Sequence, residues 1–349
     1  MSIQGDANSI KQKLQEDNNI KVKVALFGQP GAGKSSLINN IIGKKVAKAG
    51  VETDCTTVEQ AYEHGGIILV DLPGYGTGKF PLDSFLEKYS PSNYDLFLCI
   101  SESKFHEDDT ELFRMINNND KTCIFVRSKS DNIYDDDKSI SQLKSEITAD
   151  LVNQVGACDM IFISNRTKDG IDELESTIYS KLDPAKQERW AKYAKAYTEE
   201  FLNKKFEACQ STIICYAGLA AANGINPVPG LNIAVDIGII LKMFNDIKDS
   251  YGLDREKDYY ARLLPMAGEI LNNVFKVSVG AAATDAVIAL LKKNASKEVI
   301  REIAAFIPLV GSAVAASIGF GICWYAGDYY NDNCRQLAKL VMEKELAQK

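Results

Sequence analysis

The first half of the chain alternates short apolar runs with amphipathic segments. Apolar runs of strand length lie at residues 22–27, 66–70, 94–100, 122–127 and 160–163. Segments with apolar residues at helical spacing follow at 36–42, 109–116 and 171–182. Strands that alternate with helices in this way predict an α/β fold with a doubly wound, mostly parallel sheet.

Beyond Pro184 the strand pattern stops and helical spacing continues. Residues 186–206 are expected to form one helix with an apolar stripe, followed by helices at 211–223 and 231–251. The stripe is more typical of packing than of a binding face; it consists of Trp190, Tyr193, Ala194, Tyr197, Phe201 and Leu202. The pattern therefore predicts a short N-terminal helical segment at 1–20, an α/β domain at 21–183 and an all-α domain at 184–349.

Residues 303–327 contain no charged side chain, and a bilayer is spanned by about 20 apolar residues. Pro308 interrupts this stretch, many of its residues are small, and Glu302 and Asp328 bound it. We expect a buried hairpin of closely packed helices, with insertion into lipid as the alternative.

Composition narrows the classes of function. The net charge is −7 and no basic run exceeds two residues, so we expect no nucleic acid partner. The eight cysteines form no C-x-x-C pair, which is typical of reduced residues in a cytoplasmic protein. The N-terminal residues have no apolar core of a secretion signal, and Ser2 stands where myristoylation needs glycine.

The candidate chemistry begins directly after the first apolar run. Residues 28–35 read G-Q-P-G-A-G-K-S and fit the phosphate-binding pattern G-x-x-x-x-G-K-[ST]. The backbone N–H groups of this turn would surround a β-phosphate, Lys34 would contact the β- and γ-phosphates, and Ser35 would bind Mg²⁺. The candidate nucleotide contacts here are Gly28, Gln29, Pro30, Gly31, Ala32, Gly33, Lys34, Ser35 and Ser36.

The polar loop at 44–57 lies where nucleotide switches place a threonine that closes over Mg²⁺ and the γ-phosphate. Thr56 is the first candidate for this role and for metal binding, and Thr53 and Thr57 are the alternatives. Each of the three could equally be an ordinary loop or strand residue.

The sequence D-L-P-G at 71–74 ends an apolar strand. Asp71 is therefore expected to reach the Mg²⁺ shell, and the Gly74 N–H to meet the γ-phosphate. Tyr75 stands where many GTPases carry the glutamine that orients the attacking water. Slow intrinsic hydrolysis, or help from a partner, is expected.

The segment S-K-S-D at 128–131 is similar to the guanine-reading signature [NT]-K-x-D. Asp131 would accept hydrogen bonds from the guanine N1–H and N2 amine, a donor pair that adenine does not offer. Ser128 replaces the usual asparagine or threonine, and Lys129 is retained. Ser164 and Asn165 follow the last strand, where a short loop covers the base. The alternative is a solvated K-x-D segment without a ligand.

With these motifs, and with P-V-P-G-L-N-I-A-V-D at 227–236, the chain resembles the immunity-related GTPases, the interferon-inducible family of vertebrates and its relatives. The resemblance implies a P-loop GTPase with an all-α helical domain and with GTP or GDP and Mg²⁺ as ligands. It also implies a homodimer or larger homo-oligomer formed through the nucleotide face, and a cytoplasmic protein partly associated with intracellular membranes.

The resemblance further implies defence against intracellular pathogens, and catalysis assisted by an acidic side chain of the first switch. Asp54 falls on that position, with Glu52 as the second choice. Two alternatives stay open: a bacterial-type membrane-associated GTPase, and a GTP-gated scaffold with negligible turnover.

Overall fold

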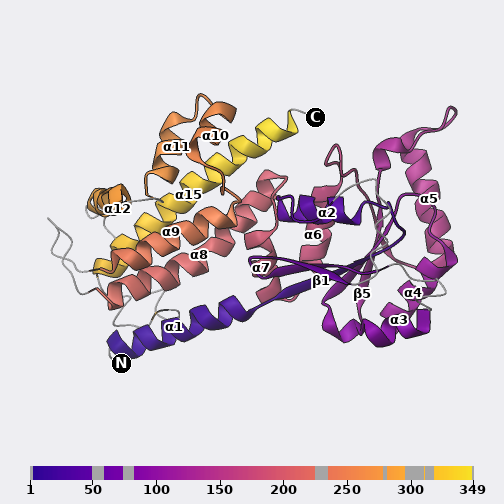
Figure 1. The fold of residues 1–349 in the computed structure, drawn as a ribbon, viewed down its shortest axis with the longest axis horizontal. Coiled ribbons are helices and arrows are strands. Elements are labelled where there is room, and N and C mark those ends of the chain that lie inside the picture. Colours follow the sequence, from indigo (N-terminus) through magenta and orange to yellow (C-terminus); the bar gives the residue numbers. More distant parts are fainter. Residues whose placement is uncertain are drawn as a thin grey trace. The chain divides into compact units, whose positions relative to one another are not determined.

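The computed structural model describes residues 3–48, 59–73, 82–224, 235–277, 281–294, 310 and 318–347. Contacts divide the chain into two compact units (Figure 1). One unit is Lys21–Lys195, and the other combines Met1–Ile20 with Ala196–Lys349. Residues 184–195, which follow the expected boundary at 183, group with the first of these units.

The unit of Lys21–Lys195 is built on one six-stranded sheet with the order β2-β3-β1-β4-β5-β6. All neighbouring strands are parallel except β2, which runs antiparallel to β3. The strands are β1 (Val22–Phe27), β2 (Gln60–His64), β3 (Ile67–Asp71), β4 (Leu96–Ser101), β5 (Thr122–Arg127) and β6 (Asp159–Phe162). The predicted doubly wound, mostly parallel sheet is confirmed.

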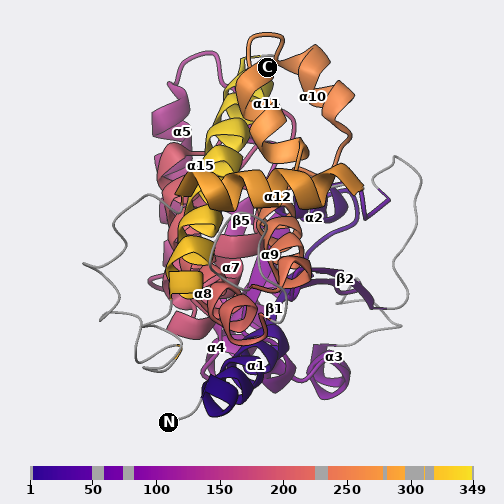
Figure 2. The ribbon, with the colours of Figure 1, turned by 90° about the vertical axis from the view of Figure 1, so that its left-hand side faces the viewer.

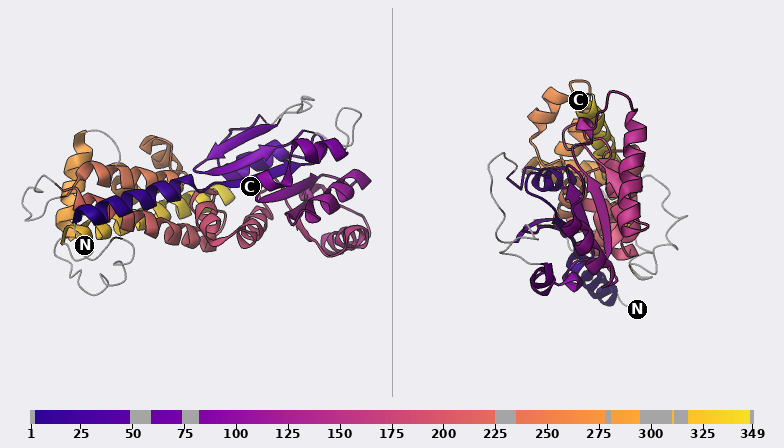
Figure 3. Two further views of the ribbon diagram at one scale, coloured as in Figure 1. Left: turned by 90° about the horizontal axis from the view of Figure 1, so that it is seen from below. Right: turned by 90° about the vertical axis from the view of Figure 1, so that its right-hand side faces the viewer.

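Helices cover both faces of this sheet (Figure 3). One face carries an aromatic core in which the Phe27 ring contacts Phe97 and the Phe113 ring contacts Phe125. The helices of the unit are α2 (Lys34–Ile42), α3 (Leu82–Lys88), α4 (Glu107–Asn117), α5 (Ile140–Val155), α6 (Ile171–Lys181) and α7 (Pro184–Tyr193), with short 3₁₀ turns η1 (Pro91–Asn93) and η2 (Ser130–Asn132).

The strand order places the reversal of the chain's path at β1. From β1 the chain first builds β2 and β3 on one side, and then β4, β5 and β6 on the other. Ligands of open α/β sheets bind outside the carboxyl ends of the strands at such a switch point. The segment that follows β1 is the phosphate-binding octet, so the topology places it there.

The second unit is helical. In the described ranges its helices are α1 (Ile3–Asn19), α8 (Glu199–Ala222), α9 (Ile237–Ser250), α10 (Lys257–Leu263), α11 (Gly268–Phe275), α12 (Ala281–Asn294) and α15 (Ile318–Leu346). Helices α1, α9 and α15 pack on α8, and α12 crosses α9 and α15 (Figure 2). Gly327 permits the close approach of α15, because a Cβ there would lie 2.6 Å from Ile213 Cγ2.

The expected single helix over 186–206 is wrong. Helix α7 ends at Tyr193, and α8 begins at Glu199 and continues through the helix that was expected at 211–223. The Thr198 hydroxyl caps α8 by accepting a hydrogen bond from Phe201 N at 3.1 Å. The apolar stripe therefore spans two helices and the link between them, and its aromatic members Trp190, Tyr197 and Phe201 are buried.

The apolar stretch at 303–327 falls mostly outside the described residues; only 310 and 318–327 belong to them. Among the helices that the structure describes, none combines the length and apolar character needed to cross a bilayer. The hairpin expected at 303–327 stays a prediction.

Candidate functional site

The phosphate-binding octet forms a tight turn between β1 and α2. Gly28 has φ 139° and passes so close to β4 that a Cβ there would lie 2.0 Å from the Ile100 carbonyl oxygen. Gly33, with φ 90°, is the N-terminal cap of α2, which begins at Lys34. The first N–H groups of a helix have no partner within it, so they remain available to an anion. The turn places Ser35 and Ser36 in the first turn of α2.

Lys34 and Asp71 lie together beneath this turn. Lys34 Nζ donates to the Gly28 carbonyl at 2.9 Å and to the Gln29 carbonyl at 3.4 Å, and it lies 4.0 Å from Asp71 Oδ1. Only 10% of the Lys34 side chain and 5% of the Asp71 side chain are exposed. Burial lowers the pKa of Lys34 and raises the pKa of Asp71, and each charge partly offsets the shift of the other.

The residues present fit a magnesium ion bound together with phosphate oxygens. Asp71 Oδ1 is buried and accepts no hydrogen bond from any residue that the structure describes. Ser35 and Asp71 offer the oxygen ligands that Mg²⁺ prefers, and Mg²⁺ is usually bound by one or two protein groups plus phosphates and water. Over the described ranges, accordingly, no group of three or more His, Cys, Asp or Glu side chains could hold a metal by itself.

The candidates of the two switches lie outside the described residues: Glu52, Thr53, Asp54, Thr56, Thr57 and Gly74. The same holds for Tyr75, which stands at the position of the usual glutamine. Their roles stay predictions.

Ser128 connects the base-reading segment to the phosphate-binding turn. Its hydroxyl is fully buried and donates to the Ala32 carbonyl at 2.6 Å and to the Ser101 carbonyl at 3.3 Å. The signature usually has asparagine or threonine at this position. Here the Ser128 hydroxyl holds the turn in place through its hydrogen bond to Ala32, a link that we call the Ser128 brace.

Asp131 is the middle residue of the 3₁₀ turn η2, and its carboxylate is held from two sides. The Ser164 hydroxyl bonds it, and Arg166 Nη2 lies 2.7 Å from Asp131 Oδ2. These contacts, first Ser164 and then Arg166, lower the pKa of Asp131. The carboxylate is therefore ionised at neutral pH, as an acceptor of two guanine donors has to be.

Lys129 precedes this turn with a left-handed φ of 51° and forms an ion pair with Glu102. Ser164 is buried, and Asn165 Nδ2 donates to the Gly33 carbonyl at 3.1 Å. The structure therefore brings the base-reading segments at 128–131 and 164–165 to the phosphate-binding turn.

Sequence reasoning missed four residues of this neighbourhood: Asn40, Glu102, Arg166 and Lys168. Arg166 directly follows Ser164 and Asn165, so its position in the loop was an available signal. Asn40 is a buried polar residue among the apolar positions of α2, which was a second signal. Nothing in the sequence pattern indicated Glu102.

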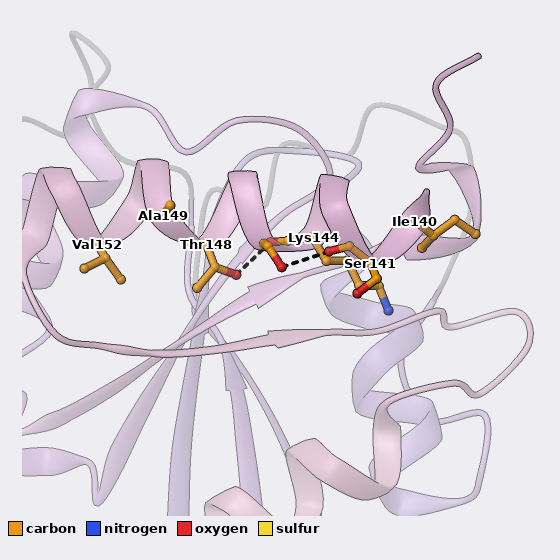
Figure 4. A pocket seen from close by; sticks show the side chains of 7 residues that line it. Ile140, Ser141, Lys144, Thr148, Ala149 and Val152 are labelled. Atoms are coloured by element: carbon orange, nitrogen blue, oxygen red, sulfur yellow. Dashed lines mark hydrogen bonds between the residues drawn. The ribbon is translucent and has the colours of Figure 1, made fainter. Parts of the chain in front are cut away.

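A separate open groove runs along α5, away from this chemistry (Figure 4). The Ser145 and Thr148 hydroxyls in the groove donate hydrogen bonds to backbone carbonyls of the same helix, at 2.9 Å each. Its lining residues are Ile140, Ser141, Lys144, Ser145, Thr148, Ala149 and Val152. Polar groups do not converge there as they do in a ligand site, so the nucleotide site is the better candidate.

Comparisons with known proteins agree with the motifs. The family model of the interferon-inducible GTPases (IIGP) matches residues 2–331. Interferon-gamma-inducible GTPase 10 of Mus musculus is 24% identical over 368 residues, covering 99% of this chain and 86% of the relative. Interferon-inducible GTPase 5 of Rattus norvegicus is 26% identical over 342 residues, covering 90% and 73%. The crystal structure of Era from Aquifex aeolicus is 23% identical with a TM-score of 0.38, covering 56% and 68%.

Proposed function

Since this chain belongs to the interferon-inducible GTPase family and is a GTPase, we propose that its hydrolysis of GTP depends on Mg²⁺ and accelerates when two copies meet at their nucleotide faces. The observation that carries the proposal is the buried pair of Lys34 and Asp71 under a phosphate-binding turn. Lys34 begins α2 and Asp71 ends β3, so an ammonium and a carboxylate lie together under the turn. The ammonium has the opposite charge to a triphosphate, and the carboxylate has the opposite charge to the bound cation.

In this mechanism the turn acts mainly by positioning. The Lys34 ammonium bonds carbonyl oxygens of the turn, and it would exchange these for the more strongly charged β- and γ-phosphate oxygens. Ser35 and Asp71, with Thr56 as the candidate from the first switch, would hold Mg²⁺, which neutralises charge developing on the transferred phosphoryl group. Asp131 selects guanine, because adenine has no matching donor pair.

The attacking water needs a group to orient it, and Tyr75 stands at the position of the usual glutamine. We therefore assign this role to an acidic residue supplied by the second copy, Asp54 first and Glu52 second. A reaction completed by a partner predicts that turnover per molecule rises with protein concentration.

The absence of glutamine after Gly74 also favours a second candidate function, a scaffold whose GTP-bound form recruits partners with negligible turnover. The test is the rate of GTP hydrolysis per molecule over a hundredfold range of protein concentration. A rate that rises with concentration supports catalysis in a dimer, whereas a flat rate near zero supports the scaffold.

The setting that we propose is the cytoplasm and the surface of intracellular membranes, in cell-autonomous immunity against intracellular pathogens. The support is the family and the interferon-inducible character that the relatives' names state. For the membrane, carbonate washing separates the two interpretations of 303–327: extraction indicates surface association, and resistance indicates insertion.

A further inference from the structure

Three side chains behind the phosphate-binding turn form a closed ring of hydrogen bonds. Asn165 Nδ2 donates to the Gly33 carbonyl at 3.1 Å, and Asn165 Oδ1 accepts from Asn40 Nδ2 at 2.9 Å. Lys168 Nζ donates to Asn40 Oδ1 at 2.6 Å and to the Asn165 carbonyl at 2.7 Å. The ring therefore joins one carbonyl of the turn to α2 and to the loop after β6.

The held carbonyl belongs to the peptide between Gly33 and Lys34. A peptide group is planar and trans, so its C=O and its N–H point in opposite directions. When Asn165, together with the helical bond from Leu37 N at 2.9 Å, fixes the Gly33 carbonyl, the Lys34 N–H is turned the other way. That N–H is among the unpaired donors at the start of α2, which face a bound phosphate.

The other two residues of the ring, Asn40 and Lys168, are each in an energetically unfavourable setting. Asn40 is a buried polar residue on an otherwise apolar helix face. Lys168 has φ 67°, a left-handed conformation that a residue with a side chain rarely adopts. Such strain persists only where surrounding contacts over-determine it, and it gathers at functional sites. Here those contacts are the two hydrogen bonds of the ammonium and the bond from Lys168 N to the Ser164 carbonyl at 2.8 Å.

We propose that Asn40 and Lys168 are positioning residues for nucleotide binding, because through Asn165 they fix the Gly33–Lys34 peptide with its N–H toward the β-phosphate. The proposal rests on the proposed function, since it requires a guanine nucleotide at the turn. It predicts that the ring favours ligands with a β-phosphate over ligands without one. GDP and GMP share the base and the α-phosphate, so the ratio of their affinities isolates this contribution.

The test is Lys168→Gly in the full chain, with GDP and GMP affinities measured by competition against a fluorescent guanine nucleotide. Glycine adopts the left-handed φ without strain, so the variant loses the ammonium and keeps the backbone path. We expect the GDP-to-GMP affinity ratio to fall about 5-fold, because one hydrogen bond to a charged phosphate is weakened. The thermal midpoint of the nucleotide-free variant checks that the variant is folded.

The matched control is Asp120→Gly. Asp120 is also a non-glycine residue with a left-handed φ, 55°, in the turn between α4 and β5. Asp120→Gly also replaces a left-handed residue by glycine, but away from the ring. The GDP-to-GMP affinity ratio of this variant should therefore equal that of the wild type. Asn40→Ala breaks the ring from the α2 side and should lower the ratio like Lys168→Gly. The double variant should lower it no further, since both act through Asn165.

An unchanged ratio in folded Lys168→Gly and Asn40→Ala overturns the proposal. An equal loss of GDP and GMP affinity also overturns it, because that result indicates a general structural role. These outcomes differ from failure of the proposed function, in which the wild-type chain itself would show no preference for GDP over ADP.

Discussion

The brace from Ser128 to the phosphate-binding turn supports a quantitative prediction for Ser128→Ala. The hydroxyl is fully buried and lies 2.6 Å from the Ala32 carbonyl. Ser101 O keeps a second donor in the variant, the backbone N–H of residue 128 at 2.8 Å, whereas Ala32 O loses the hydroxyl. A buried acceptor left without its donor costs about 1–3 kcal/mol.

We therefore expect the free energy of unfolding of nucleotide-free Ser128→Ala to fall by about 2 kcal/mol. The Ala32 carbonyl belongs to the same peptide group as the Gly33 N–H. When the carbonyl loses its hydrogen bond, the Gly33 N–H, a candidate hydrogen-bond donor to the phosphate, is also held less firmly. A loss of about 1.4 kcal/mol in that interaction lowers the affinity for GDP roughly tenfold.

Two assays check this prediction: urea unfolding of the nucleotide-free chain, and calorimetric titration with GDP. The control is Ser130→Ala, two residues along the same loop, where the backbone N–H bonds Ile163 O at 3.0 Å and survives the substitution. If Ser128→Ala unfolds within about 0.5 kcal/mol of the wild type and binds GDP equally well, the brace has no role and the reasoning is refuted.

Three further predictions concern the base, a helix cap and the helical unit. Asp131→Asn should move preference from guanosine to xanthosine nucleotides in competition binding, and unchanged GDP affinity would remove Asp131 from the base site. In the wild type the lowered pKa of Asp131 should keep GDP selectivity flat from pH 8 to about pH 5. Asp183 caps α7 by accepting from Lys186 N at 3.1 Å, so Asp183→Ala should cost about 1 kcal/mol in urea unfolding at neutral pH. The hydrogen bond from the Lys186 side chain lowers the pKa of Asp183, so this difference is present above the unfolded pKa near 3.8 and is lost as pH falls through the lower folded pKa; an equal difference in acid would contradict it. Gly327→Val places atoms about where Ile213 lies, so it should lower stability by about 1–3 kcal/mol, and an unchanged thermal midpoint would argue against the close packing of α15.

The elements that sequence alone predicted are those whose pattern is strong and local. Strands β1, β3, β4 and β5 are continuous apolar runs, and each was recognised within a few residues. Helix α5 was missed because only Leu151 of its residues is buried, which leaves little apolar periodicity to detect. The break between α7 and α8 was missed because the apolar stripe continues across it, and the capping hydroxyl of Thr198 is a weaker signal than the stripe.

The same distinction holds for the site. The octet at 28–35 was predictable because its residues are contiguous and each type has one physical role. The links from Ser128 to Ala32 and from Asn165 to Gly33 join residues 96 and 132 positions apart, and no periodicity encodes such a contact. The sequence could therefore identify the groups that contact a nucleotide, but it could not identify the side chains that hold those groups in place.

The most direct test of the account is hydrolysis of GTP and ATP by the purified full chain with Mg²⁺, beside Lys34→Ala under the same conditions. Lys34 is buried under the turn and bonds its carbonyls, so its removal takes away the only ammonium that the described part of the turn contains. We predict phosphate release from GTP, none from ATP, and none from either nucleotide with Lys34→Ala. Equal hydrolysis of both nucleotides, or full GTP turnover by Lys34→Ala, would contradict it.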